Sequence, residues 1–181
     1  FRRLLPELQN KSQRPFYLLT AGKSNSLAAS MEILSFLRQN DICGEIIHGD
    51  SDYITRRIHL LSKVEEAKKK LCGTRLGIIG EPSDWLISSH ADKAKVKEML
   101  GIELIDIPMQ ELLDEIGDTK QIYEALKVLI NRYQLQGFTL RCFDLLTTVK
   151  DTGCMALAKL NSEGYVAGCE GDIPAMLSMI I

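Results

Sequence analysis

Residues 166–181 read VAGCEGDIPAMLSMII and contain the pattern that decides the fold. The apolar run at 165–169 predicts a strand, and the following turn predicts a helix start. Asp172 can cap that helix, and Pro174 is tolerated in its first turn. The carboxyl ends of strands are where open α/β sheets bind ligands. Glu170 and Asp172 are therefore predicted to serve a hard-cation or acid/base site, or to be a helix cap beside one solvated carboxylate.

Upstream of this stretch, short apolar or β-branched runs alternate with amphipathic segments, which is typical of βαβ units. Strands are predicted at 16–20, 45–47, 75–80, 103–107, 138–143 and 165–169. Helices are predicted at 27–39, 53–71, 93–100, 110–116, 119–135, 153–160 and 175–181. Parallel strands need long crossovers, and a helical segment separates each consecutive pair of strands. We therefore predict an α/β fold of Rossmann-like parallel sheets with flanking helices.

The natural domain boundary lies near Gly73. Residues 1–72 hold two predicted strands and form a partial first α/β domain, whereas residues 73–181 hold four strands and form a more complete second one. The chain begins with Phe1 instead of methionine and ends inside a predicted apolar helix. We therefore expect a fragment of a longer protein, with the second domain truncated before a carboxyl-terminal domain.

Composition narrows the class of protein. The 181 residues are 45% hydrophobic and 25% charged, as in ordinary globular domains. A net charge of −2 with scattered basic residues argues against nucleic-acid binding, and no apolar run approaches the ~20 residues of a membrane span. Five cysteines without a CxxC pair predict reduced, mostly buried thiols, and no signal peptide is recognised. These features predict a cytoplasmic protein with neither nucleic acid nor membrane as a partner.

Two polar loops in the first domain suggest sites but have simpler explanations. Residues 21–24, AGKS, end a strand as a phosphate-binding loop would, but that motif needs glycine at position 17, where this chain has tyrosine. His48 and Asp50 could share a metal ion, although a surface turn explains them better. Neither loop is expected to be the main functional site.

A second acidic loop, Glu81-Pro82-Ser83-Asp84-Trp85, follows the strand at 75–80. Trp85 could stack on a sugar ring or could pack in the core. Five carboxylates are expected at the same edge of a parallel sheet: Glu81, Asp84, Asp144, Glu170 and Asp172. Such an oxygen-rich edge suits Mg²⁺ or Mn²⁺, or proton transfer between adjacent carbons.

Two segments resemble the L-fucose isomerase-like family, the wider fucose/arabinose isomerase group. They are residues 80–87, GEPSDWLI, and residues 169–175, CEGDIPA, with support from LLTAG at 18–22. The resemblance covers the amino-terminal and middle portions of a family member. It implies an aldose–ketose isomerase that needs a divalent ion, typically Mn²⁺, held by a glutamate, an aspartate and a histidine. Glu170 matches the glutamate, and the other two ligands would lie beyond Ile181.

The resemblance also implies a substrate pocket between subunits, hence a homo-oligomer acting on a small sugar through an enediol. Glu170 is the predicted catalytic residue and metal ligand, and the predicted substrate contacts are Trp85, Glu81, Asp84 and Asp172. The alternative is a sugar-binding or regulatory α/β module without catalysis. A flavodoxin-like nucleotide-binding domain is a third interpretation, but the sequence lacks its glycine pattern.

Overall fold

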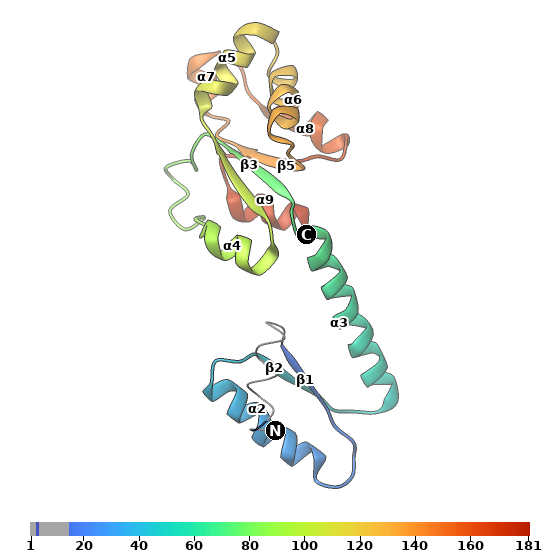
Figure 1. Cartoon of the computed structure of the whole chain (residues 1–181). Helices are drawn as coiled ribbons and strands as arrows, with labels where there is room; N and C mark the ends of the chain where they lie inside the picture. Colours follow the sequence, from blue (N-terminus) through green and yellow to red (C-terminus); the bar gives the residue numbers. More distant parts are fainter. Residues whose placement is uncertain (1–2, 4–14) are drawn as a thin grey trace. The chain divides into compact units, whose positions relative to one another are not determined.

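The computed structural model describes residue 3 and residues 15–181, and it divides the chain into two compact units (Figure 1). Unit 1 is Phe1–Glu65 and unit 2 is Glu66–Ile181. The division falls within helix α3, Ser51–Leu71. The boundary at residues 72 and 73, drawn from the sequence, lies just past the end of the same helix and stays a prediction.

Unit 1 is a small parallel α/β arrangement. Its elements are β1 (Phe16–Leu19), α2 (Ser26–Gln39), β2 (Gly44–Ile47) and the first part of α3. The two strands pair in parallel, from Phe16 beside Gly44 to Leu19 beside Ile47. Leu37 of α2 and Ile47 of β2 are buried, and α2 packs against β2.

Unit 2 contains a four-stranded sheet with helices between its strands. Its strands are β3 (Arg75–Ile79), β4 (Glu103–Ile107), β5 (Gly137–Leu140) and β6 (Val166–Cys169). Its remaining helices are α4 (Lys93–Leu100), α5 (Met109–Thr119), α6 (Ile122–Tyr133), α7 (Asp144–Thr148), α8 (Cys154–Ser162) and α9 (Ile173–Ile180). The strand order is β4-β3-β5-β6, and every neighbouring pair is parallel. The predicted α/β fold with parallel sheets is confirmed.

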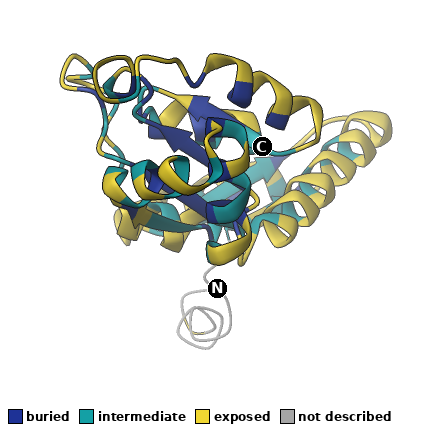
Figure 2. Cartoon of the chain, turned by 90° about the horizontal axis from the view of Figure 1, so that it is seen from above, coloured by how far each residue is buried: buried dark blue, intermediate teal, exposed yellow. Residues whose placement is uncertain are grey.

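Helices cover both faces of this sheet because successive strand residues point to opposite sides. One face carries Ile79, Phe138 and Leu140, which pack with buried residues of α5, α6 and α8. The other face carries Leu76 and Ile78, which pack with residues of α4 and α9. Figure 1 shows these two helix layers on either side of the strands, and Figure 2 shows the buried residues concentrated on the strands.

The main differences from the predicted elements are at the end of β5. The predicted strand at 138–143 stops at Leu140, and residues 144–148 form helix α7. Pairing with β6 ends where Leu140 meets Cys169, and the Leu145 amide then bonds the Cys142 carbonyl in a turn. A strand ends where its neighbour no longer offers hydrogen-bond partners. The end of β6 lies far along the sequence, so the residues of β5 themselves do not show where β5 stops.

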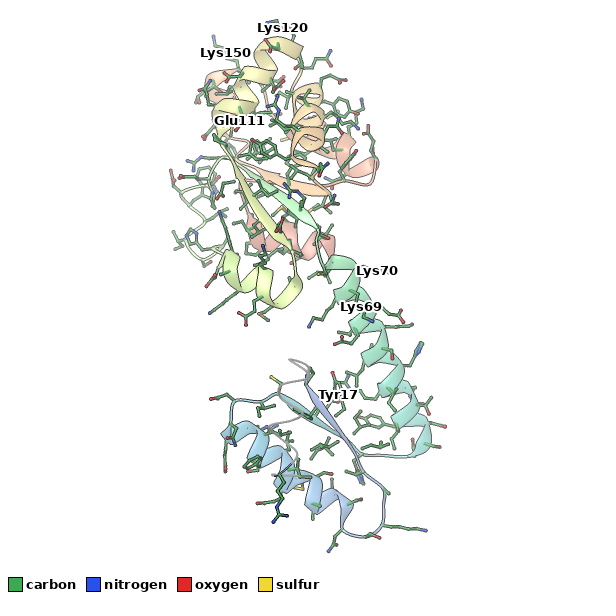
Figure 3. The ribbon with its side chains drawn as sticks, in the orientation of Figure 1. Tyr17, Lys69, Lys70, Glu111, Lys120 and Lys150 are labelled. Atoms are coloured by element: carbon green, nitrogen blue, oxygen red, sulfur yellow. The ribbon has the colours of Figure 1, made fainter. Side chains whose placement is uncertain are left out.

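The basic residues at the end of α3 are exposed to solvent. Lys69 and Lys70 are exposed on the last turn of this helix (Figure 3), where cations interact favourably with the helix dipole. None of the helices that the structure describes combines the length and apolarity needed to cross a membrane.

The cysteines depart from expectation in one respect. All five are free thiols, but only Cys142 is buried, whereas most of them were predicted to be. The four exposed ones lie in turns before strands or at the ends of elements, namely Cys43, Cys72, Cys154 and Cys169. Partial burial nevertheless raises the pKa of the Cys169 thiol.

Candidate functional site

The strand order of unit 2 creates a switch point beside β3. The chain runs from β3 to β4 on one side, and β5 then pairs on the other side of β3. Connections leave in opposite directions at such a point, so a crevice opens beyond the carboxyl ends of the two central strands. Residues 80–85 follow β3, and Arg141 follows β5 directly. The predicted acidic loop therefore lies at the position where open α/β sheets bind ligands.

A cleft of about 860 Å³ occupies this position. Its apolar lining includes Ile78, Ile107, Pro108, Met109 and Ile173. Its polar lining includes Glu81, Asp84, His90, Lys93, Asp106, Arg141 and Asp144. The cleft thus offers apolar surface together with charged groups of both signs, which suits a small polar molecule.

Arg141 holds the acidic loop over the end of the sheet. Its Nη1 donates to the Pro82 carbonyl oxygen at 2.9 Å, and its Nη2 lies 3.1 Å from Asp84 Oδ2. Its Nε donates to Asp144 at 3.0 Å. These hydrogen bonds, first to Asp84 and then to Asp144, raise the pKa of Arg141. Arg141 is not among the site residues predicted from the sequence, although a cation directly after a buried strand is a local signal.

The two segments that carry the family resemblance meet at Glu170. The Ser83 amide donates to the Glu170 carbonyl oxygen at 2.9 Å, and Trp85 Nε1 donates to Glu170 Oε2 at 2.7 Å. These contacts join loops that are 85 residues apart in the sequence. Glu81 and Asp84 belong to the same loop and line the cleft, whereas Trp85 and Glu170 are not among its lining residues.

Residues 169–172 form a tight turn with an uncommon backbone. The Asp172 amide bonds the Cys169 carbonyl at 3.1 Å, and the two central residues, Glu170 and Gly171, have φ of 62° and 70°. Two successive positive φ values are those of a type I′ turn. A glutamate with positive φ is uncommon.

The environment of Trp85 settles one of the alternatives for this residue. The side chain is 55% exposed, so Trp85 does not pack in the core. Its ring meets Phe143 edge to face, with centroids 5.3 Å apart and an interplanar angle of 84°. Stacking of a sugar on the exposed ring remains a prediction.

The five carboxylates do not gather into one cluster. Glu81, Asp84 and Asp144 line the cleft, and the latter two are paired with Arg141. Asp172 accepts a hydrogen bond from the Ala175 amide at 2.9 Å and caps α9, as the capping alternative predicted. Parallel strands bring these carboxylates to the same edge of the sheet, but their side chains bond different partners there.

No group of three or more His, Cys, Asp or Glu residues is arranged to hold a metal ion in the part of the chain that the structure describes. The described residues therefore do not complete a metal site by themselves. Glu170 stays the predicted ligand because of the family resemblance, and Trp85 bonds one of its two carboxylate oxygens.

The polar loops of unit 1 have structural roles. Asp50 accepts a hydrogen bond from the Tyr53 amide at 2.7 Å at the start of α3, which agrees with the surface-turn interpretation. His48 Nδ1 lies 2.6 Å from Thr20 Oγ1. The loop at 21–26 borders a second, open pocket of about 540 Å³.

Comparison with known proteins adds an independent finding. The chain is similar to the sulfoquinovose isomerases of Priestia aryabhattai and Priestia megaterium, at 22% identity over 189 residues. The aligned region covers 87% of this chain and 42% of each relative, so the chain spans about two fifths of the length of these curated relatives. No family model matches the sequence. The similarity supports a relation to sugar isomerases.

Proposed function

We propose that this chain is part of a metal-dependent aldose–ketose isomerase of the fucose isomerase-like group. The observation that carries the proposal is the meeting of the two resembling segments at Glu170, through the Trp85 and Ser83 hydrogen bonds. The similarity to two sulfoquinovose isomerases supports the same class of reaction. A cytoplasmic location and a homo-oligomer belong to the same proposal.

Isomerisation of an aldose requires a proton to leave the carbon beside the carbonyl and return to the adjacent carbon. A carboxylate within reach of that carbon can move the proton in both directions. We assign this role, and that of a metal ligand, to Glu170. A divalent ion, Mn²⁺ in our proposal, would stabilise the negative charge on the substrate oxygens.

The remaining site residues would bind the sugar. Glu81 lines the cleft, is exposed and can accept hydrogen bonds from sugar hydroxyls. Asp84 lines the same cleft beside Arg141. The exposed ring of Trp85 offers a stacking surface. Asp172 Oδ1 caps α9, so in this proposal Asp172 would contact the sugar through Oδ2.

The test is Glu170→Gln in the full-length protein, assayed with aldoses and Mn²⁺. The substitution keeps the size of the side chain and removes its charge, so kcat should fall by about 10²–10⁴-fold. Glu98→Gln on the exposed face of α4 is the matched control and should keep wild-type activity. A fully active Glu170→Gln enzyme would disprove the assignment.

A second candidate is a sugar-binding or regulatory module without catalysis. It is favoured by the cleft of about 860 Å³, whose lining residues do not include Glu170. Calorimetric titration with aldoses separates the two proposals. Binding that needs no Mn²⁺, together with no turnover by the full-length protein, would favour the module.

A further inference from the structure

We infer that Trp85 is a positioning residue for Glu170: its indole N–H holds one carboxylate oxygen so that the other stays available for the reaction. This inference rests on the proposed role of Glu170 and deepens it. The donor and acceptor atoms, Trp85 Nε1 and Glu170 Oε2, are 2.7 Å apart. Hydrogen bonds to an ionised acceptor are short and roughly twice as strong as neutral ones, so this contact can fix the direction of the carboxylate.

The backbone of Glu170 is fixed independently of its side chain. Its carbonyl accepts the Ser83 amide, and its left-handed conformation is closed by the bond from Asp172 to Cys169. The following residue, Gly171, lies directly against the backbone of Pro82. The turn therefore orders the backbone of Glu170, and the hydrogen bond from Trp85 orders its side chain.

Trp85 is itself held from two directions. Its ring packs on Phe143, which directly precedes α7. Its loop is tied to the sheet by Arg141, which bonds the Pro82 carbonyl and the Asp84 carboxylate. A donor that is oriented in this way loses little freedom when it bonds Glu170, which is the property expected of a positioning group.

A test of the positioning role has to separate the N–H of Trp85 from the packing of its ring. Trp85 is 55% exposed, so the rest of its surface is in contact with the protein, Phe143 included. That packing stabilises unit 2 in proportion to the apolar area it buries, and it needs no N–H donor. The N–H of Trp85, in contrast, reaches the one acidic residue that the family resemblance marks as catalytic.

The activity test is Trp85→Phe in the full-length protein. Phenylalanine keeps an aromatic ring beside Phe143 and removes the N–H donor, together with the extra area of the larger indole. Partners that orient a catalytic or ligating side chain are typically worth 10–100-fold in activity or metal affinity. We therefore expect kcat to fall by roughly 10–100-fold, with KM within about twofold of the wild-type value. Tyr17→Phe is the matched control because it removes a ring donor from a half-exposed aromatic residue of unit 1 and leaves the contact between Trp85 and Glu170 in place.

A spectroscopic test needs no activity. The 181-residue chain contains one tryptophan, so its ¹H–¹⁵N spectrum has one indole signal. We expect the indole proton to exchange slowly with solvent despite the exposed ring. Its resonance should move in Glu170→Ala and stay in place in Glu98→Gln, which changes a distant carboxylate on α4.

The outcomes distinguish this inference from the proposed function. Wild-type kcat in Trp85→Phe, together with an inactive Glu170→Gln, would overturn the inference and leave the proposed function standing. A raised KM with unchanged kcat would assign Trp85 to sugar stacking alone and would also overturn it. A fully active Glu170→Gln would remove the proposed function, and the positioning role would fall with it.

Discussion

Gly171→Ala is the substitution for which the structure gives the clearest magnitude. Gly171 has a φ of +70°, and a Cβ placed on it would lie 2.6 Å from Pro82 Cα and 2.8 Å from the Glu81 carbonyl oxygen. Both neighbours are backbone atoms, so neither can rotate out of the way. The substitution therefore forces the turn at 169–172 and the loop at 81–83 apart.

Two terms contribute to the cost. A left-handed conformation costs an alanine about 1–2 kcal/mol relative to glycine. Forcing an extra carbon into a closely packed site typically costs a further 1–3 kcal/mol. We expect unit 2 to lose about 2–5 kcal/mol, a large part of the roughly 5–15 kcal/mol that stabilises an ordinary domain.

Gly164→Ala is the matched control. Gly164 also has a positive φ, +92°, but an added Cβ would have no atom within 4 Å. It should therefore carry only the conformational term, about 1–2 kcal/mol. The effect of the substitution on the unfolded chain is similar in both variants, so the difference between them measures the contact with Pro82 and Glu81.

The assay is urea denaturation of the 181-residue chain followed by the fluorescence of Trp85, which lies in unit 2 and reports its unfolding. With a urea m-value of about 1–3 kcal/mol/M, Gly171→Ala should lower the midpoint by roughly 1–2 M. Equal midpoints for Gly171→Ala and Gly164→Ala would refute the close approach of the two loops.

Two further predictions concern charged groups. Arg141→Lys should lower the stability of unit 2 by about 1 kcal/mol and shift the Trp85 indole resonance. The three donors of an ammonium group share one nitrogen, so they cannot reproduce the fork with which the guanidinium reaches the Pro82 carbonyl, Asp84 and Asp144. An unchanged urea midpoint with an unmoved resonance would contradict the role given to Arg141. In unit 1, hydrogen bonds from Arg57 lower the pKa of the Glu45 carboxyl in the folded state. The pair therefore stabilises the folded state at pH values above about 4.3, the pKa of a glutamate in the unfolded chain. This contribution is lost as the pH falls through the lower pKa of Glu45 in the folded state. Amide exchange in β1 and β2, measured between about pH 5 and 3, should therefore depend less on pH in Glu45→Gln than in the wild-type chain, and equal pH dependence would count against the pairing.

The sequence alone determined the type and order of most elements. Apolar periodicity and the helical spacing between strands are local properties. They favour parallel strands, because two parallel neighbours need a connection long enough to hold a helix. The cap at Asp172 was predictable for the same reason, since its donor lies three residues away. The acidic loop after β3 and the turn after β6 were both recognised as candidate site segments.

Only the tertiary structure decided which of these segments touch. The strand order, with β5 beside β3, depends on how helices pack on the two faces, and no local pattern records it. That order brings Arg141 under the acidic loop and so assigns Asp84 and Asp144 to a cation. The hydrogen bond from Trp85 to Glu170 spans 85 residues and depends on the position of both loops. Sequence periodicity specifies the edge of the sheet at which a side chain emerges, whereas its partner is set by long-range packing.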